Sequence, residues 1–200
     1  MGEMIPFRTQ VKYFVENPES VDLAGFMGLF QRWVQQKVFE GQLIDVADYR
    51  HVVEGPGIVL IGHESDFAME SQRGRLGLLY TRKRQTDANL QNQLRTSFGF
   101  ALRACQLIET DTAYKGKIKF STGEVEIRLP DRLRFPNRPE VFEAVKGDIQ
   151  AVLGDVYGSV PVNLTLLSDD PRHVFTVMAQ AESTASIEEL LKQLQPSLSV

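Results

Sequence analysis

Hydrophobic and polar residues alternate most regularly over residues 43–84. The alternation has the period of two that half-buried antiparallel strands show. Turn signals at 54–57 and 71–74 divide this stretch, because glycine tolerates positive φ and proline fixes φ near −65°. The pattern therefore predicts a meander of three antiparallel strands, with its second and third strands over 57–69 and 75–84.

Tight closure of both turns predicts a register that places Asp48 opposite His63 and His63 opposite Arg82. A slip of one residue would exchange the two faces of the sheet, and this register separates them well. The row of Asp48, His63 and Arg82, with Arg50 nearby, is the candidate ligand site: a carboxylate orients an imidazole, and a guanidinium holds an anion. A structural ladder of ion pairs at the sheet rim is the alternative, and the pattern favours it.

The polar face of the same register places Asp45 opposite Asp66, with Glu64 and His51 near them. Hard oxygen donors of this kind suit a divalent cation. Such charged side chains also serve to keep a solvated face of a protein in solution, and this role is favoured over a metal site. The sequence thus predicts no cofactor.

Helical periodicity flanks the meander on both sides. Hydrophobic stripes predict helices near 22–39, 87–109, 139–154 and 186–195, the second of them capped by Thr86 and Asp87. Hairpins are expected around 121–124 and 168–171. Hairpins with interspersed helices predict an α+β fold, in which a mainly antiparallel sheet is covered by two long helices, a third helix and a short C-terminal one. Without a linker, residues 1–200 are expected to form a single domain of two loosely similar halves, about 1–112 and 113–200.

Composition adds constraints on class rather than on activity. The chain is 42% hydrophobic and 24% charged, as soluble globular proteins are, and its net charge of −4 makes nucleic-acid binding an unfavoured expectation. No signal peptide and no stretch of about 20 apolar residues is visible, so we expect a soluble cytoplasmic protein without a membrane segment. The single cysteine, Cys105, falls in a helical stripe and is expected to be a buried, inert thiol.

Arginine is concentrated in the segment RLPDRLRFPNR, at Arg128, Arg132, Arg134 and Arg138. Together with the RKR segment at 82–84, these residues could form an anion-binding surface. An exposed loop whose charges protect a sheet edge is the favoured explanation.

The segments VKYFVENPESVDL, HVVEGPGIVLIGHESDF and GRLGLLYTRKR resemble a family of uncharacterised bacterial proteins. The resemblance implies a bacterial, cytoplasmic, single-domain protein and assigns no activity or functional residue. No phosphate loop, dinucleotide-binding motif, nucleophile elbow or HExxH helix occurs. The sequence therefore predicts a binding or self-association module, with a homo-oligomer and a small anionic ligand as candidate partners, rather than an enzyme. The alternative is a small-molecule enzyme or metal-assisted hydrolase that uses His63 with nearby carboxylates.

Overall fold

The computed structural model describes residues 5–84 and 89–198, and these hold eight strands, four α-helices and two short 3-10 helices. The strands are β1 (Thr9–Val15), β2 (Leu43–Tyr49), β3 (Gly57–Gly62), β4 (Ser65–Glu70), β5 (Gly77–Arg82), β6 (Phe120–Leu129), β7 (Val162–Leu166) and β8 (Phe175–Ala181). The helices are α1 (Phe26–Gln36), α2 (Leu90–Thr110), α3 (Pro139–Tyr157) and α4 (Ile187–Leu198), and the 3-10 helices are η1 (Pro18–Ser20) and η2 (Gln72–Gly74).

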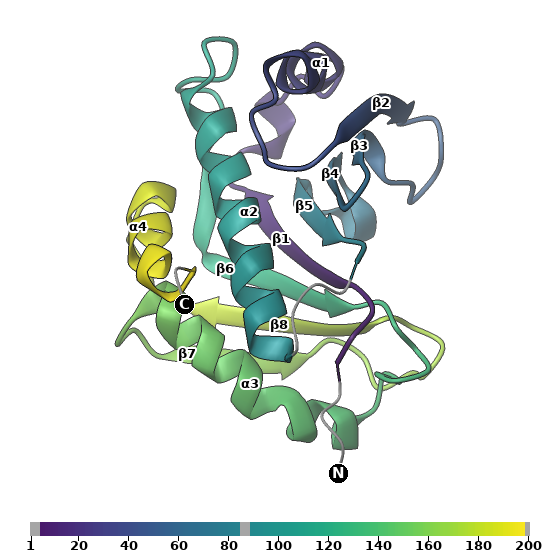
Figure 1. Cartoon of the computed structure of the whole chain (residues 1–200), viewed down its shortest axis with the longest axis vertical. Coiled ribbons are helices and arrows are strands. Elements are labelled where there is room, and N and C mark those ends of the chain that lie inside the picture. Colours follow the sequence, from purple (N-terminus) through teal and green to yellow (C-terminus); the bar gives the residue numbers. More distant parts are fainter. Residues whose placement is uncertain (1–4, 85–88, 199–200) are drawn as a thin grey trace.

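The eight strands form one antiparallel sheet in the order β2-β3-β4-β5-β1-β6-β8-β7 (Figure 1). Strand β1 lies between β5 and β6, so it joins the N-terminal meander to the strands of the second half of the chain. The sheet therefore runs without interruption through both halves. The predicted α+β class with an antiparallel sheet is confirmed.

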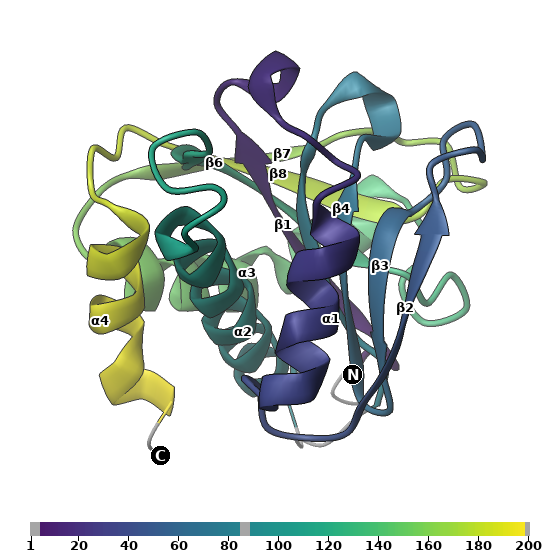
Figure 2. The same ribbon diagram turned by 90° about the horizontal axis from the view of Figure 1, so that it is seen from above.

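The helices lie together on one face of the sheet (Figure 2). Helix α2 crosses the middle of the sheet and packs on β1 and β5, while α1 covers β2 and β3. Alternate strand residues fill this layer: Val11 and Tyr13 on β1, and Leu78 and Tyr80 on β5, are fully buried. Cys105 on α2 is buried in the same core, as its place in the hydrophobic stripe predicted.

The central stretch forms four strands, and the predicted continuous strand over 57–69 is wrong. His63 and Glu64 make a turn between β3 and β4. Gly62 allows this turn, because a side chain there would approach the carbonyl oxygen of Ser65 to 2.6 Å. The turn also changes which residues face the helices: Ile58 and Leu60 enter the core, whereas the continuous strand would have placed Val59 and Ile61 there.

Two further predictions about local structure concern a hairpin around 121–124 and the cap of the second long helix. The predicted hairpin around 121–124 is wrong, because β6 continues from Phe120 to Leu129 and pairs with β1 on one side and β8 on the other. The predicted caps Thr86 and Asp87 lie outside the described residues. Helix α2 is capped by Asn89, whose side chain accepts a hydrogen bond from the backbone N–H of Asn92 at 2.8 Å.

Candidate functional site

The structure separates the residues of the predicted Asp48–His63–Arg82 row. Asp48 pairs with Ile58 rather than with His63, so this part of the predicted register is wrong. Its carboxylate lies 2.7 Å from Nη2 of Arg50 at the solvent-exposed end of β2. The hydrogen bonds from Arg50 lower the pKa of Asp48 to about 2.

His63 and Arg82 are also not opposite each other. Arg82 pairs with Ser65 on β4, whereas His63 lies in the preceding turn. There its Nε2 lies 2.8 Å from Nη2 of Arg84. The expected row therefore fails for two reasons: the β2–β3 register places Asp48 opposite Ile58, and the extra turn takes His63 out of the strand that pairs with β5.

The four residues considered for a metal lie on separate elements. Asp45 and Asp66 flank Ile61 from opposite sides, so β3 lies between them and their predicted pairing is wrong. His51 lies in the loop after β2, and Glu64 lies in the β3–β4 turn. Within residues 5–84 and 89–198, no group of three His, Cys, Asp or Glu side chains could hold a metal ion.

The sheet face opposite the helices presents two rows of side chains that the register aligns from strand to strand. One row, here called the polar row, consists of Asp66 on β4, Thr81 on β5, Gln10 on β1, Arg128 on β6 and Thr176 on β8. In the neighbouring row, the residues on β3, β4 and β5 are apolar: Val59, Ala68 and Leu79. We call these three residues the apolar strip.

These rows form the floor of a groove of about 720 Å³. Glu54, Pro56 and Arg73 line it on the side of the β2–β3 loop and η2. The β7–β8 loop lines it on the other side, with residues 167–168 and 172–174. The polar row and the apolar strip both lie in this groove, which has the size usual for small-molecule sites.

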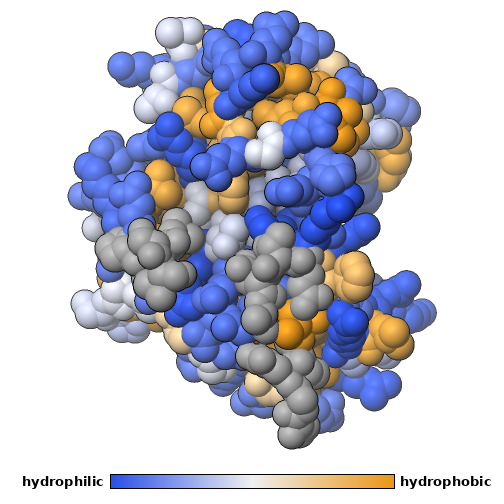
Figure 3. All heavy atoms as spheres, viewed as in Figure 1, coloured by the Kyte–Doolittle hydropathy of each residue, from blue (hydrophilic) through white to orange (hydrophobic). Residues whose placement is uncertain are grey.

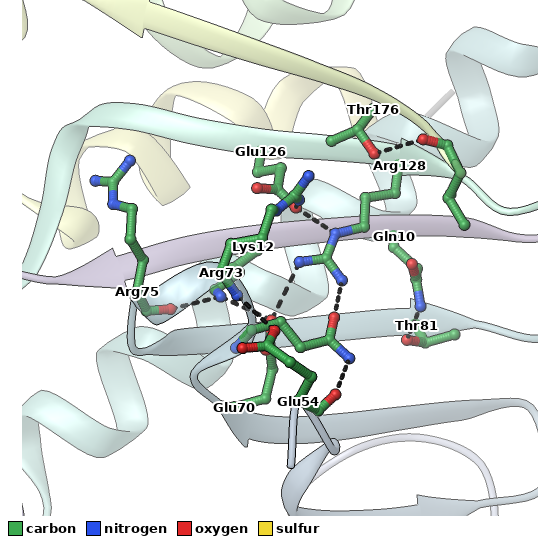
Figure 4. A network of polar contacts seen from close by, with 12 residues as sticks. Gln10, Lys12, Glu54, Glu70, Arg73, Arg75, Thr81, Glu126, Arg128 and Thr176 are labelled. Atoms are coloured by element: carbon green, nitrogen blue, oxygen red, sulfur yellow. Dashed lines mark hydrogen bonds and ion pairs between the residues drawn. The ribbon is translucent and has the colours of Figure 1, made fainter. Parts of the chain in front are cut away.

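A buried ion pair lies beside the groove, on the same face of the sheet (Figure 4). Nζ of Lys12 lies 2.7 Å from Oε1 of Glu70, and both side chains are fully buried. The ammonium also donates to the backbone carbonyl of Arg75 at 2.6 Å. Burial lowers the pKa of Lys12, and the charge of Glu70 partly opposes that shift. The pair thus joins the central strand β1 to β4 through charge as well as through the sheet.

Arg128 connects this pair to the groove (Figure 4). Its Nη2 contacts Glu70 at 3.2 Å, its Nη1 donates to Oε1 of Gln72 at 2.8 Å, and its Nε donates to Glu126. Glu126 also binds Nη2 of Arg73 at 2.5 Å. These contacts engage three of the five N–H donors that a guanidinium carries, so Arg128 is held rigidly and keeps donors for a further acceptor.

The groove exposes the cationic side of this network. Arg73 and Arg128 line the groove, whereas their acidic partners Glu70 and Glu126 do not line it, with 0% and 3% of their side chains exposed. The carboxylate of Asp66, which also lines the groove, is paired with Lys83 at 2.8 Å. Glu54 also lines the groove, and its carboxylate accepts the backbone N–H of Arg73 at 2.9 Å. A ligand entering the groove therefore meets two guanidinium groups whose carboxylate partners Glu70 and Glu126 are buried.

Sequence reasoning missed most of this site. Arg128 belongs to the arginine cluster that the sequence singled out, but Arg132 and Arg134 use their guanidinium groups on backbone carbonyls of Arg172 and Ile5. The usable signal was the polar alternation inside strands, such as Glu126 and Arg128 between buried apolar neighbours. Charges at such positions must find partners in the fold, and here the partners come from distant segments.

Ser168 and His173, at the mouth of the groove, form a serine–histidine contact of 3.0 Å between Oγ and Nδ1. Both residues belong to the β7–β8 loop, and the serine oxygen also accepts the backbone N–H of Asp170 at 3.1 Å. The carboxylate of Asp170 is bound by Arg172 at 2.6 Å. The contact therefore closes the loop that forms one wall of the groove.

Neither a family model nor a curated protein matches this sequence, and no solved structure matches this fold. The resemblance to a bacterial family stays a prediction. None of the helices in the described part of the chain is both long enough and apolar enough to cross a membrane.

Proposed function

We propose that this protein is a binding module for a small anionic ligand, and that the ligand occupies the groove on the open face of the sheet. The proposal rests above all on Arg128. Its side chain is only 8% exposed, it lines the groove, and its carboxylate partners are buried and do not line the groove. A largely desolvated guanidinium with remaining donors binds oxyanions more strongly than a hydrated one does.

The surrounding polar side chains support the same function. Nε2 of Gln10 donates to Oγ1 of Thr81 at 2.9 Å, and Oγ1 of Thr176 donates to the carbonyl of Val174 at 2.9 Å. Each hydroxyl or amide keeps hydrogen-bonding capacity beyond these contacts. The second amide N–H of Gln10 and the O–H of Thr81 therefore supply neutral donors beside Arg128, as anion sites commonly do, whereas the one O–H of Thr176 is already donated to Val174.

Titration of the 15N-labelled protein with sodium phosphate, sodium acetate and sodium 2-naphthoate tests this function. We expect at least one anion to shift the amide resonances of Thr81, Arg128 and Thr176 in a saturable way. The Arg73→Gln variant should weaken that binding severalfold, because it removes a cation from the groove. Arg32→Gln is the matched control: Arg32 is a similarly exposed, ion-paired arginine, 45% against 49%, and it lies outside the groove. Absence of saturable shifts with all three anions would refute the proposal.

Self-association at the β2 end of the sheet is a second candidate function. Strand β2 is terminal in the sheet, and large hydrophobic side chains are exposed on it or just after it: Ile44 by 53%, Tyr49 by 40%, Val52 by 43% and Val53 by 91%. Hydrophobic side chains gather where α1 and β2 lie (Figure 3). Such patches mark contact surfaces in many proteins.

Sedimentation velocity over a wide range of protein concentrations tests this second function. Association that Val53→Asp abolishes and that Leu133→Asp, at an equally exposed residue on another loop, leaves unchanged would support it. A monomer at all concentrations would exclude it.

A further inference from the structure

The floor of the groove has two chemically different parts. Val59, Ala68 and Leu79 form a small hydrophobic cluster of their own, with Ile61 packed against it, on the face opposite the main core. The polar row begins beside this strip, with Thr81 two residues beyond Leu79 on β5. A ligand that fills the groove must therefore be apolar on one side and polar on the other.

The spacing of the strands sets the size of such a ligand. Neighbouring strands lie about 4.8 Å apart. Leu79 on β5 is two strands from Arg128 on β6, and Ala68 on β4 is three strands away. The strands of Leu79 and Ala68 thus lie roughly 10–15 Å from β6. The Arg128 side chain extends back towards them, because its guanidinium reaches Glu70 on β4 at 3.2 Å. Gln10 and Thr81, which are hydrogen-bonded to each other, lie between these two ends.

We propose that the ligand is an organic oxyanion with a flat or elongated apolar body. Its carboxylate or phosphate group accepts hydrogen bonds from Arg128, with Arg73 at the mouth of the groove, and its body lies on the apolar strip. This inference rests on the proposed function and adds the chemical class of the ligand. An inorganic anion would make no use of the apolar strip, whose residues are 5–8% exposed and line the groove. A neutral apolar molecule would give the remaining donors of Arg128 no acceptor.

Three probes of matched shape or charge test the inference by calorimetry and by amide NMR: 2-naphthoate, 2-naphthamide and inorganic phosphate. The first carries both features, the second lacks the charge, and the third lacks the apolar body. We expect 2-naphthoate to bind at least tenfold more tightly than either of the others, with resonance shifts at residues 66–68, 79–81 and 128.

Two variants separate the two ends of the site. Leu79→Thr introduces a residue type that strands favour but removes part of the apolar strip. It should weaken the binding of 2-naphthoate at least fivefold and leave the binding of phosphate unchanged. Ala68→Ser makes a smaller change to the same strip and serves if Leu79→Thr does not fold. Arg128→Lys should weaken both anions, because an ammonium cannot replace a bidentate guanidinium. Leu133→Thr, at an exposed residue outside the groove, is the control for Leu79→Thr.

The possible outcomes separate failure of this inference from failure of the proposed anion-binding function. Phosphate that binds in the groove as tightly as 2-naphthoate would leave the anion-binding function standing and overturn the inference alone. Equal binding of 2-naphthamide and 2-naphthoate, without phosphate binding, would overturn both proposals. Shifts confined to the cavity of about 530 Å³ between α1, α2 and α4, around Phe39 and Phe100, would place the probe elsewhere and would also overturn both. Both proposals are likewise overturned if no probe binds.

Discussion

Removing the charge of Glu70 gives the sharpest test of the buried network beside the groove. Glu70 and Lys12 are both fully buried and lie 2.7 Å apart, so Glu70→Gln leaves a buried ammonium without its nearest counterion. Loss of one partner of a buried pair lowers the free energy of unfolding by about 3–5 kcal/mol. Because a domain of this kind has about 5–15 kcal/mol in total, we expect a large shift of the urea midpoint.

The effect of Glu70→Gln should also depend on pH in a defined direction. Burial lowers the pKa of Lys12 below its ordinary 10.5, and Glu70 is the main group that raises it again. Without Glu70 the native pKa falls further. Between that lowered pKa and 10.5, the unfolded chain binds more protons on this lysine than the folded protein does, so the free energy of unfolding rises with pH. The deficit of the variant relative to the wild type should therefore shrink as pH rises towards 10.5.

Urea unfolding of three variants checks this reasoning. Glu124→Gln is the matched control, because Glu124 belongs to an ion pair with Arg75 in which its side chain is 31% exposed, and its loss should cost less than about 1 kcal/mol. The double variant Lys12→Met with Glu70→Gln should regain part of the loss, since it removes the isolated ammonium. A deficit for Glu70→Gln as small as that of the control, or a deficit that does not change with pH, would refute the assignment.

Three further expectations concern other titratable groups. Burial raises the pKa of Glu109, whose carboxylate accepts the backbone N–H of Phe120 at 2.8 Å. The Glu109 carboxyl therefore contributes stability below its unfolded pKa of 4.5, and this contribution is lost as pH rises through the folded pKa. In chemical unfolding, the change in the free energy of unfolding caused by Glu109→Gln should therefore be more stabilising at neutral pH than at pH 4. An equal change at both pH values would contradict this. The buried Cys105 thiol, whose pKa burial raises, should react with an aromatic disulfide reagent only on unfolding, and fast reaction of the folded protein would count against its burial. The carboxyl of Asp48 should titrate by NMR at about 2, and Arg50→Gln should return it to near its ordinary value; an unchanged titration would show that Arg50 is not the cause.

Local rules predicted the helices well, because their signals lie within a few turns of chain. The stripe expected over 87–109 becomes α2, Leu90–Thr110, with Leu94, Phe98 and Ala101 fully buried, and the third helix begins at Pro139 as expected. Amphipathic periodicity and a proline in the first turn carry this information directly. The antiparallel α+β class follows from the same local evidence.

Strand pairing and the site required the tertiary structure. A turn of two polar residues at His63 and Glu64 interrupts no hydrophobic pattern that the sequence displays, yet it places Val59 on the sheet face opposite the core and separates His63 from Arg82. The groove depends on the register of β1 with β6, which brings Gln10 opposite Arg128 across 118 positions of sequence. No periodicity within one segment encodes such a pairing.

The sequence by itself therefore determined where helices form, which face of the long helices is buried, and that Cys105 is buried. The tertiary structure alone decided that Lys12, Glu70 and Arg128 meet, and that their cationic end faces a groove. The physical reason is one of range. Periodicity and capping act over a few residues, whereas the burial of a charge is tolerable only where the whole fold delivers its partner.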